Sequence, residues 1–281
     1  MRASIRAKLA LVRFPWADRT GRTVPLKLVV FLALFVPGLW VAYALATGQL
    51  GGQPLKEATR QLGTMGLRLF MFSLAVSPLR SLWHWPTAML IRRMLGVGAF
   101  AYLALHFTMY VASQGFDLAT VASEIVLRIY LTIGFVALLG LAALAATSTD
   151  GMIKRLGGKN WRRLHKLAYP LGVLAIVHFF LQARLDAIET QVTAGLFVWA
   201  MAWRVAKAYG QAGWAVTLAL GIAAALLVPL AEAGFIAIKL GAPFWMVFTA
   251  NFDPELAPRP AHVILGFVGA VCAVAFARAR P

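Results

Sequence analysis

The chain has 281 residues, of which 61% are hydrophobic and only 13% are charged, and its mean hydropathy is +0.76. A soluble domain of this length does not need so much apolar surface, and several apolar runs are long enough to cross a bilayer. The formal net charge of +17 comes from basic residues between these runs, so we attribute it to membrane topology and expect no nucleic-acid partner. The composition indicates a polytopic membrane protein surrounded by lipid.

The N-terminal segment, residues 1–25, is basic and precedes the first apolar run. It lacks a convincing cleavage site for a signal peptide, so we expect it to be a cytoplasmic arm followed by a retained first span. Cys272 is the one cysteine of the chain, which excludes an internal disulfide. The motif Cys-x-x-Cys-His is also missing, so any heme would be held without covalent attachment.

Apolar periodicity predicts an all-α bundle of about eight membrane-spanning helices, with both termini in the cytoplasm. This map places most of the 27 basic residues on the inner side, together with only Asp18 and Asp150 among the acids, as the positive-inside rule requires. We expect residues 26–210 to form a six-helix domain and residues 211–281 to be an extension with two further spans. The predicted spans are residues 26–46, 62–77, 94–112, 125–146, 164–182, 192–205, 214–231 and 262–277.

Two histidines lie inside apolar spans at matching depths. His106 follows Arg93 by thirteen residues and His178 follows Arg163 by fifteen, and both spans start from the cytoplasmic side. At about 1.5 Å per residue, the two imidazoles reach nearly the same level in the outward half of the membrane. Ionisable groups inside a membrane are usually functional, and two imidazoles can serve as the axial ligands of a b-type heme. The pattern predicts an electron-transferring heme, whereas the alternative is that each histidine simply bonds a neighbouring helix.

Four further residues are candidate cofactor ligands, and each has a structural alternative. His165 lies roughly 20 Å along the helix from His178, near the cytoplasmic entrance, where it serves either a second heme or flavin or only the membrane interface. Arg68 either pairs with heme propionates or extends to the outer interface. Arg92 and Arg93 either hold a flavin phosphate or anchor the topology.

These residues occur in a set of strings: IRRMLG from Ile91, AYLALH ending at His106, YLT from Tyr130, TST from Thr147, and WRRLHKL from Trp161 followed by His178. In this order the strings resemble the MsrQ family, the heme-binding membrane subunits of bacterial protein-methionine-sulfoxide reductase systems. That family lies within the ferric-reductase-like transmembrane superfamily. The similarity extends over about residues 37–207.

The resemblance implies a multi-pass protein of the bacterial inner membrane that carries one or two b-type hemes, with FMN as a further candidate cofactor. It implies an electron-transfer subunit rather than the catalytic one. Electrons would come from the quinone pool or a cytoplasmic flavin reductase and pass to a periplasmic molybdopterin-containing methionine sulfoxide reductase. The cofactor-associated positions of the family fall on His106, His165, His178, Arg68, Arg92 and Arg93.

The chain departs from the family pattern in two respects. Family members end shortly after the sixth span, whereas this chain continues for about seventy residues. The span of His106 has a single histidine where the wider superfamily carries pairs, so a second heme lacks an obvious second ligand. Two other functions stay open from the sequence: a quinol-linked cytochrome b or ferric reductase, and a transporter or assembly protein with a broken first helix at Pro37 and Gly38.

Overall fold

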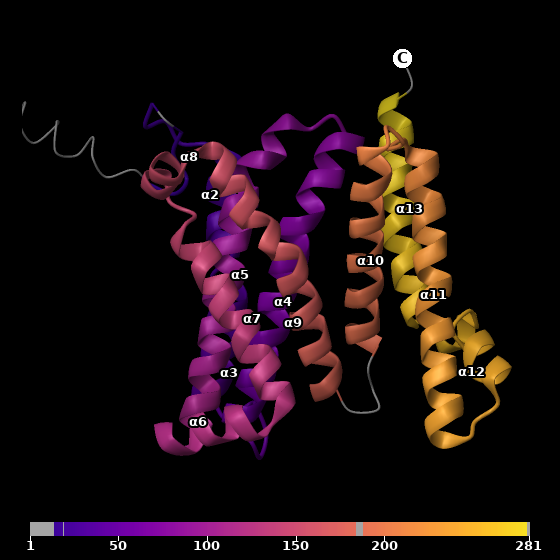
Figure 1. The fold of residues 1–281 in the computed structure, drawn as a ribbon, viewed down its shortest axis with the longest axis horizontal. Helices are drawn as coiled ribbons and strands as arrows, with labels where there is room; N and C mark the ends of the chain where they lie inside the picture. The colour runs from indigo at the N-terminus through magenta and orange to yellow at the C-terminus, as the bar shows by residue number, and fades with distance from the viewer. Residues whose placement is uncertain (1–13, 19, 184–187, 280–281) are drawn as a thin grey trace, which may run out of the picture.

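The computed structural model describes residues 14–18, 20–183 and 188–279. In these ranges the chain is a bundle of helices that run up and down in alternation (Figure 1), and its β-structure is one isolated bridge between Ala17 and Thr23. The helices are α2 (Pro25–Ala33), α3 (Val36–Ala46), α4 (Pro54–Leu82), α5 (Met89–Ser113), α6 (Leu118–Leu127), α7 (Ile129–Ala146), α8 (Asp150–Leu164), α9 (Ala168–Gln182), α10 (Ile188–Ala208), α11 (Trp214–Leu240), α12 (Phe244–Ala250) and α13 (Pro260–Ala279), with short 3-10 turns at Pro86–Ala88, His165–Leu167 and Pro254–Leu256.

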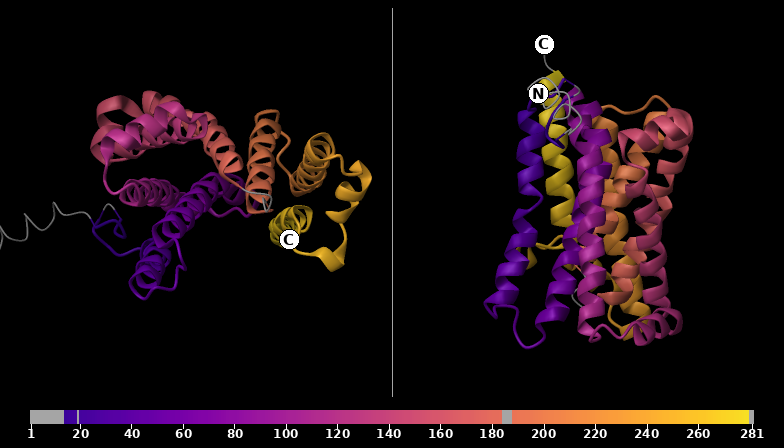
Figure 2. Two further views of the ribbon diagram at one scale, coloured as in Figure 1. Left: turned by 90° about the horizontal axis from the view of Figure 1, so that it is seen from below. Right: turned by 90° about the vertical axis from the view of Figure 1, so that its left-hand side faces the viewer.

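Seven helical segments of the described chain are long and apolar enough to cross a membrane. Helix α10 is not among them, but it has 21 residues, enough to rise about 31 Å, and it runs beside the others (Figure 1). With α10 included the chain makes eight passes, and α2 begins on the face where α13 ends (Figures 1 and 2). The predicted all-α bundle of about eight spans is therefore confirmed.

Two segments that were expected to be mostly loop form helices along the two faces of the bundle, and residues 125–127, expected to begin the fourth span, belong to the first of them. Residues 118–127 form α6, which lies across the end opposite α8 (Figure 1) and is capped by the Asp117 carboxylate, an acceptor for the N–H groups of Ala119 and Thr120. Residues 150–164 form α8, interrupted at Gly157, where φ is 72°. Because α8 is strongly basic, its face of the bundle is the cytoplasmic one.

A tyrosine of α5 forms hydrogen bonds to the backbone groups left unpaired at the break in the first span. Pro37 cannot donate to the carbonyl of Ala33, so α2 ends there, slightly earlier than the expected break at Pro37 and Gly38. The Tyr102 hydroxyl donates to Leu34 O at 2.6 Å and accepts from Gly38 N–H at 2.7 Å. It thus bridges two groups that would bond each other in a continuous helix.

The core around the later site is formed by two helix pairs, α4 with α5 and α7 with α9. Phe70 and Leu74 of α4, Leu141 of α7 and Ile176 of α9 belong to one buried cluster. Phe197 brings α10 into the same cluster. The two pairs are therefore fixed relative to each other by apolar packing.

The last two long helices pack on α10 at one end of the bundle (Figure 2, orange and yellow). Trp199 and Trp203 of α10 are buried in a second core with residues of α11 and α13. Helix α13 is also tied to the cytoplasmic end of α4, because Trp83 Nε1 donates to Val271 O at 3.0 Å and Arg278 Nη1 donates to Trp83 O at 2.7 Å. The division into an arm, a six-helix domain and an extension stays a prediction.

Replacing Tyr102 with Phe should lower the free energy of unfolding by about 1–2 kcal/mol, since two partly buried backbone groups lose their partner. The control is Tyr43→Phe on α3, where the side chain is 54% exposed. Unfolding in detergent micelles, followed by circular dichroism, measures both. Equal midpoints for the two variants would show that Gly38 and Leu34 bond each other when the hydroxyl is removed.

Candidate functional site

The imidazoles of His106 on α5 and His178 on α9 lie side by side, as their matching depth predicts. Their ring centres are 6.3 Å apart and their planes are nearly perpendicular, at 85°. Metal–imidazole bonds are about 2.0 Å long, so two rings bound on opposite sides of one metal ion have their centres roughly 6 Å apart. The observed separation is therefore suitable for one shared ion.

Both rings are oriented by hydrogen bonds to helix carbonyls. His106 Nδ1 lies 2.7 Å from Thr59 O of α4, and His178 Nδ1 lies 2.7 Å from Tyr130 O of α7. Because a carbonyl oxygen only accepts, each Nδ1 carries the proton and each Nε2 keeps its lone pair. This is the usual arrangement for a metal-binding histidine, in which the second nitrogen fixes the tautomer.

The two histidines line a cavity of about 720 Å³ between the helix pairs. This volume lies within the range of roughly 300–1,000 Å³ that is typical of cofactor and ligand sites. Most of its wall is apolar, with Leu67 and Leu103 on one side and Phe135 and Leu138 on the other. The cavity can therefore hold a large, mainly apolar group.

The outer end of the cavity is polar. Lys56 and Arg60 line it, and the Arg60 guanidinium is paired with both oxygens of Glu57, at 2.6 and 2.9 Å. The Tyr110 hydroxyl of α5 also lines the cavity, is buried, and has no hydrogen-bond partner within the described residues. A buried hydroxyl without a partner is costly, so this one is suited to bonding a polar substituent of a bound group.

These features together fit a b-type heme. Two imidazoles leave four positions of a six-coordinate ion, which is the number that a porphyrin fills. The apolar walls suit the macrocycle, while the cations and the free hydroxyl at the outer end suit its propionates. The residues present are thus matched to both parts of the cofactor.

Arg68 lies apart from this cavity. Its guanidinium pairs with Glu189 of α10, at 2.5 and 2.6 Å, and lines a neighbouring pocket of about 260 Å³. Arg60 lines both spaces. The sequence analysis missed Lys56 and Arg60 because it began the second span at the first apolar run, Leu62, whereas α4 begins earlier at Pro54.

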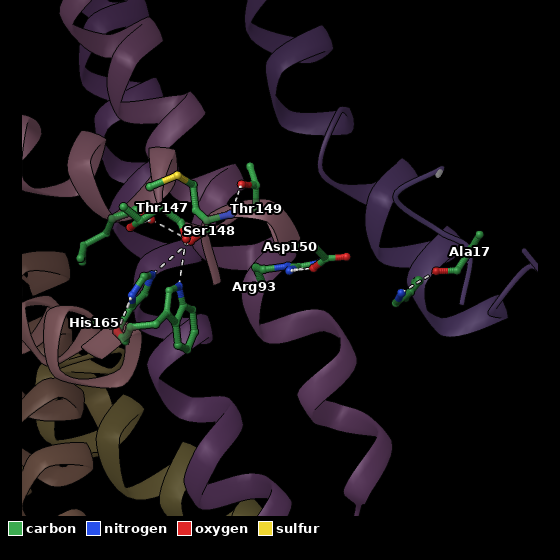
Figure 3. A network of polar contacts seen from close by, with 11 residues as sticks. Ala17, Arg93, Thr147, Ser148, Thr149, Asp150 and His165 are labelled. Carbon is green, nitrogen blue, oxygen red and sulfur yellow. Dashed lines mark hydrogen bonds and ion pairs between the residues drawn. The ribbon is translucent and has the colours of Figure 1, made fainter. Parts of the chain in front are cut away.

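His165 is not brought near the other two histidines. Its ring stacks on Trp161 with centres 3.9 Å apart, and its Nδ1 lies 3.1 Å from Trp161 O. Its Nε2 lies 3.2 Å from Ser148 Oγ (Figure 3). Both nitrogens of His165 therefore have protein neighbours at the cytoplasmic end.

Arg92 and Arg93 lie at the same end as His165. Arg93 forms an ion pair with Asp150 at the start of α8 (Figure 3), so one of the two predicted phosphate ligands already has an acidic partner. Arg92 lies close enough to His165 and to Arg204 of α10 for its charge to act on both. These residues are therefore neighbours towards the cytoplasmic end.

Arg204 is a third residue that was not predicted from the sequence. Its guanidinium donates to Ala200 O at 2.6 Å and to Leu74 O at 2.5 Å, and lies 5.5 Å from the centre of the Tyr169 ring. The carbonyl of Leu74 lacks its helical donor because residue 78 of α4 is a proline. The signal available in the sequence was an arginine that directly follows a tryptophan-rich apolar stretch.

Comparison with known proteins adds independent information. Residues 62–176 match the family described as "Ferric reductase like transmembrane component". No solved structure matches the chain. The matched segment includes His106 and His165 and ends two residues before His178.

Several curated relatives carry the name "Protein-methionine-sulfoxide reductase heme-binding subunit MsrQ". The one from Rhodospirillum rubrum is 41% identical over 192 residues, which is 68% of this chain and 90% of the relative. The one from Ralstonia nicotianae is 39% identical over 202 residues, covering 68% and 93%. The one from Caulobacter vibrioides is 36% identical over 178 residues, covering 63% and 85%.

These relatives and the apolar helices identify a multi-pass protein of the inner membrane. The resemblance seen in the sequence strings is confirmed by similarity over most of each relative's length. The chain belongs to the MsrQ family.

Proposed function

We propose that this chain carries electrons across the inner membrane through a b-type heme whose axial ligands are His106 and His178. The donor is the quinone pool or a cytoplasmic flavin reductase, and the acceptor is a periplasmic molybdopterin-containing methionine sulfoxide reductase. The observation that carries the proposal is the pair of imidazoles 6.3 Å apart, each with its Nδ1–H bound to a carbonyl. The relatives' name, heme-binding subunit, supports it.

When bound, a heme with two histidine ligands supplies one-electron transfer and has no open iron position for oxygen. The protein's part is to hold and insulate it. His106 and His178 would hold it through the Nε2 atoms that their Nδ1 hydrogen bonds leave free, and the apolar wall with Leu67 and Leu103 would exclude water from the rings. Arg60 and Tyr110, which line the outer end of the cavity, would bind the acidic groups of the cofactor.

We include a second redox centre at the cytoplasmic end in the proposal. His165 and His178 are thirteen residues apart, roughly 20 Å along the helix, so the outer heme leaves the inner half of the membrane to be crossed. His165, Arg92 and Arg93 are the residues that would bind FMN or a second heme there. At the outer end, Arg68 assists the propionates by neutralising Glu189, a carboxylate that also lines the cavity.

A ferric reductase is the second candidate function, because residues 62–176 match the ferric-reductase-like component. It would use the same two histidines and the same cavity. The difference lies in the final acceptor, a chelated ferric ion instead of a protein that reduces methionine sulfoxide. The acceptor must therefore be tested directly.

Purified protein should show the absorption spectrum of a low-spin b-type heme, and His106→Ala or His178→Ala should remove it or convert it to high spin. The matched control is His84→Ala, an exposed histidine in the loop after α4. Spectra of the oxidised and reduced forms, with a pyridine-hemochrome assay, measure the result. Low-spin spectra that persist in both variants would rule out this ligand pair.

The same samples separate the two candidate functions. Once reduced by a quinol or by a flavin reductase, the wild-type heme should be reoxidised rapidly by the periplasmic reductase with a methionine sulfoxide substrate. Ferric chelates should reoxidise it slowly. The opposite order would favour the ferric reductase.

Replacing Tyr110 with Phe should weaken heme binding without destabilising the heme-free protein, because the hydroxyl has no protein partner to lose. We expect a several-fold higher dissociation constant in heme titrations and an unfolding midpoint that is unchanged or slightly higher. Arg60→Gln should weaken binding more strongly than Arg68→Gln, since only Arg60 lines the heme cavity. If both arginine variants weakened heme binding equally, Arg60 would have no specific role in binding the propionates.

Replacing both Arg92 and Arg93 with Gln should reduce the flavin content of the purified protein and leave the low-spin heme spectrum unchanged. The reason is that a phosphate loses its guanidinium donors, while His106 lies thirteen residues beyond Arg93 on the same helix, in the outward half of the membrane. Acid extraction and fluorescence of the released flavin provide the measurement. A wild-type protein purified without flavin would remove FMN from the proposal.

A further inference from the structure

Each of the two proposed heme ligands lies directly against a glycine of the helix that its own helix is paired with. A Cβ atom added to Gly63 of α4 would lie 2.6 Å from His106 Nδ1 and 3.0 Å from its Cε1. A Cβ atom added to Gly134 of α7 would lie 2.5 Å from His178 Nδ1 and 2.6 Å from its Cε1. These distances are too short for non-bonded atoms, so any larger residue must displace the ring.

The glycines are placed in the same way relative to the two carbonyl acceptors. Gly63 follows Thr59 by four residues, and Gly134 follows Tyr130 by four. In an α-helix, residues four apart lie one above the other on the same face. Each imidazole therefore packs against the backbone of its glycine. Its Nδ1 lies 2.7 Å from the carbonyl oxygen one helical turn away in both cases.

This arrangement occurs twice on elements that are unrelated in sequence. The α4–α5 pair and the α7–α9 pair each supply one carbonyl, one glycine and one histidine. Other glycines in close contact, such as Gly66 against Leu103 or Gly140 against Leu171, face apolar side chains and only allow helices to approach. Gly63 and Gly134 are the described glycines that meet an imidazole.

We propose that Gly63 and Gly134 are positioning residues that set the ring planes and the tautomers of His106 and His178. This inference rests on the proposed function, because the rings are taken to be heme ligands. Both glycines line the cavity beside their histidines, and the role proposed for them is exerted through the imidazoles. Each acts through its histidine by leaving the space that the hydrogen bond from Nδ1 requires.

Two measurable properties of the heme depend on this role. A hydrogen bond donated by Nδ1 makes Nε2 a stronger electron donor, which stabilises ferric iron and lowers the reduction potential. Ring planes at 85° also act on two perpendicular iron d orbitals almost equally. Near-equal orbital energies produce a strongly anisotropic low-spin signal in electron paramagnetic resonance, whereas parallel rings produce a less anisotropic one.

The first test uses the heme-free protein and a double-mutant cycle. Gly63→Ala should lower the unfolding midpoint in the wild-type background and cause little or no loss in the His106→Ala background, where the ring that it displaces is gone. The same relation should hold for Gly134→Ala with His178→Ala. The matched control is Gly66→Ala, one turn along α4, whose effect should be the same with and without His106 because it meets Leu103.

A loss of stability or of folding that persists in the double variants would overturn the proposal, since the glycine would then act through the backbone alone. A midpoint unchanged by Gly63→Ala in the wild-type background would also overturn it. Recovery of folding in the double variant supports it, even where the single variant does not fold.

The second test uses the heme-loaded protein. Gly63→Ala and Gly134→Ala should each reduce the anisotropy of the resonance signal and raise the reduction potential, or lose the heme altogether. Gly269→Ala on α13, where an added Cβ meets nothing within 4 Å, should behave as wild type. Signals and potentials equal to those of Gly269→Ala would contradict the positioning role.

The outcomes distinguish this inference from the proposed function. If His106→Ala and His178→Ala keep a low-spin heme, the ligand assignment itself fails. If those variants lose the heme but the glycine variants keep the wild-type signal and potential, only the positioning role fails. The double-mutant cycle measures the interaction between glycine and imidazole in the heme-free protein, so it does not depend on the ligand assignment.

Discussion

The structure of the site depends on two hydrogen bonds from imidazole to helix carbonyl. A histidine in an apolar bundle is unfavourable unless its nitrogens find partners. Thr59 O and Tyr130 O satisfy one nitrogen of each ring and leave the other nitrogen with a free lone pair, and both rings line the cavity. Burial is thereby made compatible with a ring that is still able to bind a metal.

The rest of the bundle gives direction to that site. The polar end of the cavity, with Arg60 and Tyr110, faces outwards, while the basic helix α8 and the stacked Trp161 and His165 lie at the opposite face. Charge is thus concentrated at the two surfaces, and the interior between them is apolar. Such a distribution favours a fixed orientation of an acidic cofactor and matches transfer from the inner to the outer side.

The overall bundle and the adjacency of His106 and His178 were predictable, because span boundaries and a constant rise per residue fix depth. The close contacts of Gly63 with His106 and of Gly134 with His178 were not predictable, since they depend on how neighbouring helices are aligned along their axes. Lys56 and Arg60 were left outside the predicted second span because hydropathy marks the apolar part of a helix and not its start. Helices α6 and α8 were missed for the related reason that they are too short or too polar to give a spanning signal.

Helix α10 has a consequence for how the chain enters the membrane. It carries Arg204 and Lys207 and is not among the helices apolar enough to cross by composition. It packs against α4 and α9 on one side and against α11 and α13 on the other. Because α11 and α13 are synthesised after α10, the face of this pass that carries Trp199 and Trp203 gains its protein cover only once both later helices have been made.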